Sequence, residues 1–261
     1  MAEPLLALER VTMQFGGITA LDNVTLHVDA GEIMGLIGPN GAGKTTVFNV
    51  VTGVYHPTSG DVRFNGESIA GEKRYRITRR GIARTFQNIR LFPEMTALEN
   101  VMVGVDAHAR TSVPGALARL PRSRTEEKTT RDTAMQLLEF MGIAGEADNA
   151  ARNLAYGFQR RLEIARAMAT QPKILLLDEP AAGFNPAEKR ELGKLIRTIR
   201  DRGFTVLLIE HDMSVVMSVC DRINVLDFGK HIADGKPAAI RNDPKVIQAY
   251  LGVPADAARG T

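Results

Sequence analysis

The chain has 261 residues, and its 33 Lys and Arg against 30 Asp and Glu give a formal net charge of +3. Hydrophobic residues make up 44% and charged residues 24%, a composition that excludes a largely disordered chain. A net charge of +3 spread over 261 residues produces only a weak electrostatic field, so the charge alone does not indicate nucleic-acid binding. Cys220 is the only cysteine, which excludes an intrachain disulfide and a cysteine-based zinc site and favours a reducing compartment.

The N-terminal sequence does not have the order of a secretory signal. Glu3 and Pro4 stand where such a signal has a basic and then an apolar segment. The most apolar windows, residues 33–37 and 174–177, are far shorter than the roughly 20 residues that cross a bilayer. We therefore expect a cytoplasmic protein that works at a membrane only through partner proteins.

Antiparallel strands are predicted near the N-terminus. Residues 6–15 and 24–28 alternate apolar and polar side chains, as half-buried strands do. Residues 61–66 resemble a further antiparallel strand that ends in a turn. These segments are typical of a sheet with one face packed on a core.

A glycine-rich loop lies between a predicted buried strand at residues 32–38 and a predicted helix at residues 47–51. It fits the pattern G-x-x-x-x-G-K-[ST], in which backbone N–H groups point at phosphate oxygens and the helix adds its positive N-terminal end. Lys44 is predicted to reach the β- and γ-phosphates, Thr45 to offer its hydroxyl to Mg²⁺, and Thr46 to contact the α-phosphate. The predicted nucleotide site consists of Gly38, Pro39, Asn40, Gly41, Ala42, Gly43, Lys44, Thr45 and Thr46.

The middle of the chain, about residues 90–165, has a helical pattern. Within it, residues 105–125 are poorly patterned and hold four arginines, two prolines and a single acid. A basic loop facing lipid or nucleic acid is one interpretation of this stretch. A solvated connection is the favoured one, because no aromatic side chain is present there to stack on bases.

The last third alternates strands with helices. Residues 173–178 and 204–210 are continuous apolar runs of the kind found in strands covered on both faces. Between them, Asn185 is predicted to cap a helix that starts at Pro186 and stops before Gly203. Strands separated by helices predict a parallel α/β sheet.

Two carboxylates close the first of these apolar strands. Asp178 is placed to hold Mg²⁺, through water, beside the nucleotide phosphates. Glu179 is placed to take a proton from an attacking water molecule. Together with the glycine-rich loop, this pair predicts nucleotide hydrolysis.

The order of these motifs resembles the nucleotide-binding subunit of an ABC transporter, over residues 5 to 252. The resemblance implies that Phe15 stacks on adenine and that Gln87 touches Mg²⁺ and the lytic water. It also implies that His211, in the sequence Ile-Glu-His-Asp, holds the γ-phosphate. The nucleotide would be ATP with Mg²⁺.

The family signature, Leu-Ser-Gly-Gly-Gln, corresponds here to Leu-Ala-Tyr-Gly-Phe. Ala155 lacks the hydroxyl that would bond the γ-phosphate of the partner subunit, whereas Gly157 and the helix after it still offer backbone N–H groups. Phe158 and Asn185 are further departures, since the family commonly has Asp at the second of these positions. The contact with the partner is expected to be weakened but not lost.

The fold implied by the resemblance is an α/β P-loop NTPase core with a mainly parallel sheet, an N-terminal antiparallel β subdomain and an inserted α-helical subdomain at about residues 90–165. A single domain would span residues 5–252, followed by a flexible tail at residues 253–261. Each ABC cassette needs a second cassette, identical or paralogous, because the signature of one completes the phosphate site of the other. The signature variant and the closing Tyr-Leu-Gly resemble the branched-chain amino-acid importer subgroup.

This resemblance predicts the ATPase of an amino-acid importer, bound to integral membrane permease subunits on the inner face of the cell membrane. A substrate-binding protein would be an indirect partner, and no nucleic-acid partner is expected. One alternative is the ATPase of another ABC transporter, such as a lipid or lipopolysaccharide exporter, although those relatives usually keep Ser-Gly in the signature. A second alternative is a soluble ABC ATPase that acts on DNA or ribosomes, but this chain has neither two cassettes nor a long coiled coil.

Overall fold

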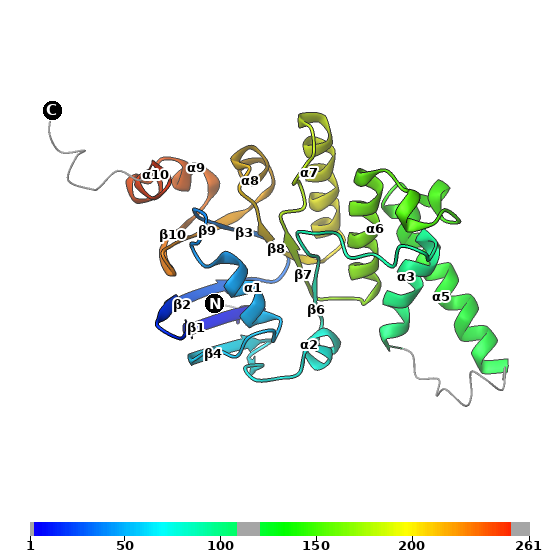
Figure 1. Cartoon of the computed structure of the whole chain (residues 1–261), viewed down its shortest axis with the longest axis horizontal. Helices are drawn as coiled ribbons and strands as arrows, with labels where there is room; N and C mark the ends of the chain where they lie inside the picture. The colour runs from blue at the N-terminus through cyan, green and yellow to red at the C-terminus, as the bar shows by residue number, and fades with distance from the viewer. Residues whose placement is uncertain (1–2, 109–120, 252–261) are drawn as a thin grey trace, which may run out of the picture. The chain divides into compact units, whose positions relative to one another are not determined.

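The structure is a computed structural model that describes residues 3–108 and 121–251. Its contacts divide the chain into two compact units, a first unit of residues 1–77 and 176–261 and a second unit of residues 78–175 (Figure 1). Most of the predicted basic stretch and the whole predicted tail at residues 253–261 lie outside the described residues. The organisation as a single domain at 5–252 with an insertion at 90–165 stays a prediction.

An antiparallel sheet opens the first unit. Its strands are β1 (Leu6–Phe15), β2 (Ile18–Val28), β4 (Ser59–Phe64) and β5 (Glu67–Ser68), in the order β2-β1-β4-β5. The alternation predicted from the sequence is present, because every second residue at the start of β1 is buried. The strand expected at residues 24–28 begins earlier, at Ile18, because Ile18, Thr19 and Leu21 also pair with β1.

A mainly parallel sheet forms the core of the first unit. The order is β10-β9-β3-β8-β7, and β3 is parallel to both β8 and β9, whereas β10 is antiparallel to β9. Every residue of β3 and β8 is buried, as expected for strands covered on both faces. The strands are β3 (Ile33–Ile37), β7 (Ile174–Asp178), β8 (Thr205–Ile209), β9 (Arg222–Asp227) and β10 (Lys230–Gly235).

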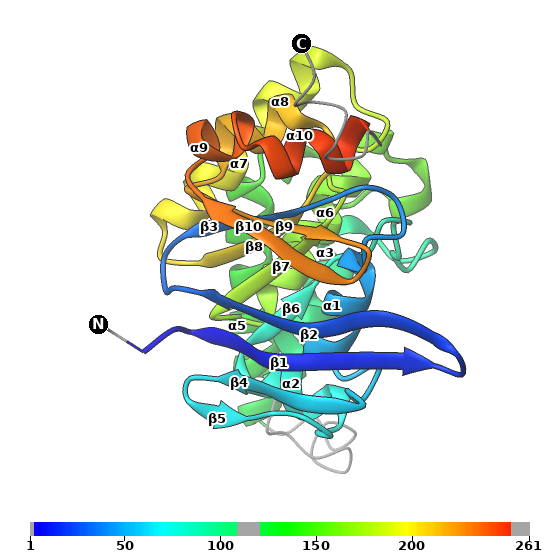
Figure 2. The same ribbon diagram turned by 90° about the vertical axis from the view of Figure 1, so that its left-hand side faces the viewer.

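Helices cover this sheet. The capping predicted for α7 (Pro186–Asp201) is confirmed, because the side chain of Asn185 accepts two backbone N–H groups and Glu188 completes a capping box. The short helices α9 (Pro237–Arg241) and α10 (Pro244–Leu251) lie against β10, and α9 also contacts β9 (Figure 2). The other described helices of this unit are α1 (Lys44–Val51) and α8 (Met213–Val219), while α2 (Arg74–Arg80) crosses into the second unit.

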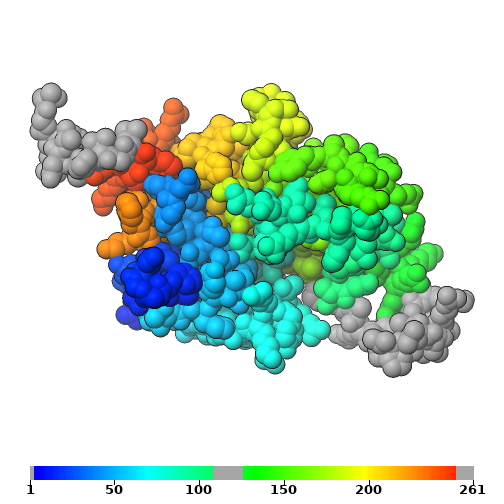
Figure 3. Space-filling view, viewed as in Figure 1, coloured from blue at the N-terminus to red at the C-terminus, as the bar shows by residue number. Residues whose placement is uncertain are grey.

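The second unit is mostly helical. Its helices are α3 (Ala97–Val105), α5 (Pro121–Phe140) and α6 (Tyr156–Ala169), with short 3₁₀ turns at Asp106–His108, Ala144–Glu146 and Ala151–Asn153. Its strand β6 (Ile82–Arg84) follows Gly81. The carbonyl oxygen of Gly81 accepts the backbone N–H groups of Lys173 and Ile174, at the start of β7. In Figure 3 the teal segment that leads into α3 lies at the surface of this unit.

The predicted fold class is therefore confirmed, with one antiparallel sheet, one mainly parallel sheet and a largely helical unit. Within the part of the chain that the structure describes, no helix combines the length and the apolar character needed to cross a bilayer.

Candidate functional site

The glycine-rich loop joins β3 to α1 in the first unit, as the sequence predicts. Lys44 is buried, and its Nζ donates hydrogen bonds to the carbonyl oxygens of Gly38 at 2.6 Å and Pro39 at 2.9 Å. Burial lowers the pKa of Lys44, whereas the nearby charges of Glu179 and Asp178 oppose that shift. Lys44 is thus a desolvated cation facing two carboxylates, and its present partners are carbonyl oxygens that a phosphate can replace.

Glycine is required at two positions of this loop. Gly38 has a φ of 151°, and a Cβ there would lie 2.1 Å from the carbonyl oxygen of Leu226. Gly43 has a φ of 101°, and its Cβ would lie 2.8 Å from the carbonyl oxygen of Ala20. A side chain at either position would force the loop open. No atom lies within 4 Å of a Cβ built on Gly41, so the centre of the loop has open space for a bound group.

Asp178 ends β7 and Glu179 follows it directly, as predicted. Asp178 is buried, and the backbone N–H of Glu179 bonds the carbonyl oxygen of Ile209 at 2.9 Å. Glu179 has a φ of 47°, a strained conformation for a residue other than glycine and one that recurs at functional sites. Its Oε1 lies 3.3 Å from Nδ1 of His211. The structure therefore brings together three of the predicted groups, the lysine, the carboxylates and the histidine.

Two residues missed by the sequence analysis hold this arrangement. Glu210 is buried, and its Oε1 accepts the backbone N–H of Ala181 at 2.7 Å, which fixes the loop after Glu179. Burial raises the pKa of Glu210. Lys189 on α7 bonds Asp212 at 2.5 Å, and this contact lowers the pKa of Asp212. In the sequence, Glu210 is marked only by its place next to His211, and Lys189 only by its place on the helix that Asn185 caps.

Phe15 is the predicted adenine platform and is the last residue of β1. Phe15 is 41% exposed, and its ring makes a T-shaped contact with that of Tyr55, with centroids 5.0 Å apart. An aromatic side chain that is fixed by a neighbouring ring and partly open to solvent can stack on a base. Its assignment to adenine stays a prediction.

The residues present fit Mg²⁺ that arrives with phosphates. No group of three or more His, Cys, Asp or Glu side chains in the described ranges 3–108 and 121–251 is arranged to hold a metal ion alone. Mg²⁺ is usually held by one or two protein oxygens together with substrate phosphates and water. Asp178 beside Lys44, with Thr45 at the start of α1, provides such an incomplete oxygen set.

Gln87 lies in the second unit, in an exposed segment held by α6. The guanidinium of Arg160, completely buried, donates to the carbonyl oxygens of Phe86 at 2.7 Å and Gln87 at 2.8 Å. Glu163 pairs with Arg160 at 2.7 Å and accepts the N–H groups of Phe86 and Arg90. The buried pair thus fixes the backbone that carries Gln87. The sequence analysis missed it, because Arg and Glu three residues apart are typical of an exposed helix face.

The signature variant forms the start of α6. Ala155 is the N-cap residue, and no side chain caps this helix. A Cβ built on Gly157 would meet no atom within 4 Å, and Phe158 is exposed. The first turn of α6 therefore presents N–H groups and open space to a group outside this unit. Gln87, Ala155 and Gly157 all belong to the second unit, and their roles stay predictions.

Comparisons with known proteins show the family of the chain. A model of the family described as ABC transporter matches residues 21–182, and one described as branched-chain amino acid ATP-binding cassette transporter matches residues 230–256. The chain is 49% identical, over 97% of its length and 99% of the relative, to the high-affinity branched-chain amino acid transport ATP-binding protein BraF of Pseudomonas aeruginosa. The same identity and coverage hold for LivG of Escherichia coli strain K12. The lipopolysaccharide export ATP-binding protein LptB of Haemophilus influenzae is 35% identical over 95% of this chain and 97% of that protein.

Solved structures show the same fold. The ADP conformation of MJ1267, an ATP-binding cassette of an ABC transporter, has a TM-score of 0.84 and 32% identity, covering 97% of this chain and 100% of that one. A nucleotide-free ATP-binding cassette from an ABC transporter has a TM-score of 0.83 and 31% identity, with 96% and 100% covered. With the family match, the half-identical relatives and the phosphate loop in its expected place, the chain belongs to the ABC transporter family.

Proposed function

We propose that this chain binds ATP with Mg²⁺ and hydrolyses ATP as the energy-coupling subunit of a membrane importer for branched-chain or related amino acids. The observation that carries the proposal is the cluster in the first unit where Lys44 faces Asp178 and Glu179. A desolvated lysine in a glycine-rich loop attracts phosphate, and two carboxylates beside it supply a metal ligand and a base.

Each residue of the cluster has a distinct task. Lys44 exchanges its carbonyl partners for oxygens of the β- and γ-phosphates. Thr45 and Asp178 would hold Mg²⁺, which would supply positive charge beside the phosphates. Glu179 accepts a proton from the attacking water, and His211, 3.3 Å from it, fixes the orientation of that carboxylate and bonds the γ-phosphate.

The second unit carries the other predicted groups. Gln87, which the family resemblance assigns to the metal and the lytic water, lies on a backbone that Arg160 fixes within this unit. Gly157 and the first turn of α6 contact the ATP held by a second cassette, identical or paralogous, so two ATP molecules lie between two cassettes. A dimeric ATP-binding cassette, MJ0796, supports this arrangement through its fold, with a TM-score of 0.74 and 28% identity.

The transported substrate is inferred from the relatives. The proteins that share 49% identity over nearly their whole length are named for high-affinity branched-chain amino acid transport, whereas the lipopolysaccharide export relative shares 35%. This difference favours an amino-acid importer over the lipid or lipopolysaccharide alternative. The partners would be integral permease subunits and, indirectly, a substrate-binding protein, with the cassette on the cytoplasmic face of the membrane.

Two variants of the purified chain test the ATPase. Lys44→Ala should weaken ATP binding and abolish hydrolysis, because the phosphate charge loses its partner. Glu179→Gln should keep ATP binding, hydrolyse very slowly and elute as a dimer in size-exclusion chromatography with ATP and Mg²⁺. Unchanged ATP affinity in the first variant would contradict the phosphate site, and rapid hydrolysis in the second would point to another base.

Uptake in cells tests the substrate. Deleting this gene should abolish the high-affinity uptake of labelled leucine, isoleucine or valine and leave glutamate uptake unchanged. The wild-type gene should restore uptake, whereas the Glu179→Gln gene should not. Normal uptake of all three amino acids after deletion would contradict the proposed substrate while leaving the ATPase intact.

A further inference from the structure

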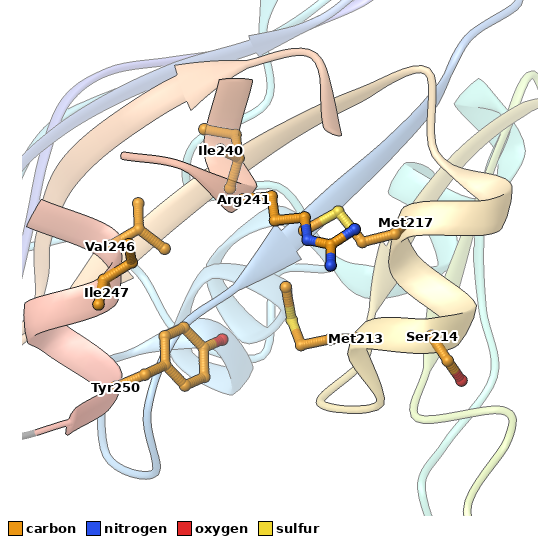
Figure 4. Close-up of a pocket in the computed structure, with 8 residues that line it drawn as sticks. All are labelled: Met213, Ser214, Met217, Ile240, Arg241, Val246, Ile247 and Tyr250. Atoms are coloured by element: carbon orange, nitrogen blue, oxygen red, sulfur yellow. The ribbon is translucent and has the colours of Figure 1, made fainter. Parts of the chain in front are cut away.

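A pocket of about 570 Å³ lies in the first unit, where α8, α9 and α10 meet (Figure 4). Binding sites for small molecules typically have volumes of roughly 300–1,000 Å³ and mostly apolar walls with a few polar groups. None of the described lining residues belongs to the predicted ATP site. The pocket therefore has the size of a ligand site and is separate from the residues that carry the proposed hydrolysis.

The walls of the pocket are apolar. Met213 and Met217 line it from α8, and Ile240, Val246 and Ile247 line it from α9 and α10. Ile247 is 44% exposed, so part of this apolar surface still faces water. Methionine side chains adapt to the shape of what they contact, and each methylene group that leaves water stabilises a complex. These walls fit a flexible aliphatic chain.

One cation belongs to the described lining. Arg241 is the last residue of α9, and Figure 4 shows its guanidinium directed across the pocket toward α8. Within the described part of the chain, no hydrogen bond or ion pair joins this side chain to another group. Asp212, which precedes the first lining residue of α8, pairs with Lys189 instead. Arg241 is thus available to an anion from outside the chain, and a guanidinium binds a carboxylate through two parallel hydrogen bonds.

The other polar groups limit the charge of the ligand. The side chains of Ser214 and Tyr250 add two hydroxyls to the pocket, whereas its described lining contains no aspartate or glutamate. An ammonium group placed there would lose water without gaining a carboxylate partner. A zwitterionic amino acid is therefore disfavoured, and a ligand with a single negative charge is favoured.

We propose that this pocket binds an aliphatic monocarboxylate. The apolar chain of the ligand lies between the side chains of α8 and those of α9 and α10, and its carboxylate pairs with Arg241. The site goes beyond the proposed ATPase and does not rest on it, because no residue of the ATP site is part of the described lining. Its test therefore uses the chain without nucleotide.

Isothermal titration calorimetry of the wild-type chain with sodium decanoate tests the ligand class. Decanoate should bind at one site with a dissociation constant of about 1 mM or lower. Octanoate, which is two methylene groups shorter, should bind about tenfold more weakly if the whole chain is buried. Decylamine carries the opposite charge and leucine carries an additional ammonium group, so neither should bind measurably.

Three variants locate the site. Arg241→Gln should weaken decanoate binding about five- to twentyfold, and it should leave the affinity for uncharged octan-1-ol unchanged. Arg190→Gln is the matched control, because it removes the same charge from an exposed arginine on α7 outside the described lining, and it should bind decanoate like wild type. Met217→Trp places a larger side chain in the pocket and should abolish binding of both ligands. Melting curves of all three variants show whether each is folded.

Four results would overturn the proposal. Absence of decanoate binding, or equally tight binding of decylamine, would show that the pocket does not select a carboxylate. Equal decanoate affinity in Arg241→Gln and wild type would remove the anchor, and this comparison decides even if Met217→Trp is unfolded. Full binding by a folded Met217→Trp chain would place the ligand elsewhere. A nucleotide-free chain that elutes as a dimer, and as a monomer after Ile247→Asp, would assign the pocket to a second copy of the chain.

Discussion

Gly157→Asp separates the signature contact from the stability of the fold. Gly157 lies in the first turn of α6, and a Cβ there meets no atom within 4 Å, so the side chain fits without displacement. Aspartate ranks only just above glycine in helix propensity, so the backbone effect favours folding by only about 0.3 kcal/mol. An acidic group in the first turn adds about 0.3–1 kcal/mol through the helix dipole. The melting temperature should therefore stay equal or rise.

Hydrolysis should nevertheless collapse. In the proposed assembly the new carboxylate faces the γ-phosphate of the ATP on the second cassette. Two unit charges about 4 Å apart near a protein surface repel by about 4 kcal/mol. This energy corresponds to about a thousandfold loss, and it opposes the closed pair that hydrolysis requires. ATP binding to the single chain should survive, because Lys44 and its loop belong to that chain.

The assay compares Gly157→Asp with Gly157→Ala, which fills the same open space without a charge. Turnover of the alanine variant should stay within about tenfold of wild type, and that of the aspartate variant should fall about a thousandfold, with equal ATP affinity in both. Melting curves confirm that neither variant is unfolded. Normal turnover in Gly157→Asp would show that this segment is an ordinary helix start and would refute the two-cassette mechanism. Equal losses in both variants would show that shape, not charge, is responsible.

Three further predictions concern the first unit. Phe15→Ala should raise KM for ATP with a smaller effect on kcat, because stacking supplies affinity but no chemistry, and a fall in kcat alone would assign the ring to packing. Burial raises the pKa of Cys220 to about 12, so iodoacetamide should label it only after unfolding, and rapid labelling of the native chain would contradict its burial. Burial also raises the folded-state pKa of Glu210, so wild-type stability is lost as pH rises through that pKa. The amide oxygen of Glu210→Gln can still accept the N–H of Ala181. The melting temperature of this variant should rise relative to that of wild type as the pH increases from 4 to 7, and a difference that stays constant over this range would refute this reasoning.

Local features could be predicted from the sequence because neighbouring residues determine them. Asn185 caps α7, and Pro186 begins it, through contacts within four residues of each other. The phosphate loop is equally local, since its glycines, its lysine and the helix after it are consecutive. The alternation of residues 6–15 fixes which face of β1 is buried. In each case the decisive partner lies within a few positions of the residue concerned.

Features that depend on distant partners were missed. The buried pair of Arg160 and Glu163 satisfies carbonyl and N–H groups more than 70 residues away, and no spacing in the sequence reveals that. The hairpin of β9 and β10 was missed as well, since β10 has half-exposed and exposed residues and lies at the edge of its sheet. The positions of groups that hold the site are thus tertiary information, whereas the site motifs are not.

The helices differ in how the N–H groups of their first turns are satisfied. In α3, α7 and α8, a side chain of Thr96, Asn185 or Asp212 accepts the first N–H groups, so these helix starts are already satisfied. Helices α1 and α6 have no side-chain cap, and they follow Gly43 and Ala155. The five-residue helix α9 also lacks a side-chain cap, but it begins with Pro237, which has no N–H to satisfy. The first N–H groups of α1 and α6 require an acceptor from elsewhere, and phosphate is a strong acceptor that a helix start attracts. The alanine in the signature therefore leaves the N–H groups of α6 available to a phosphate, just as the glycine before α1 does.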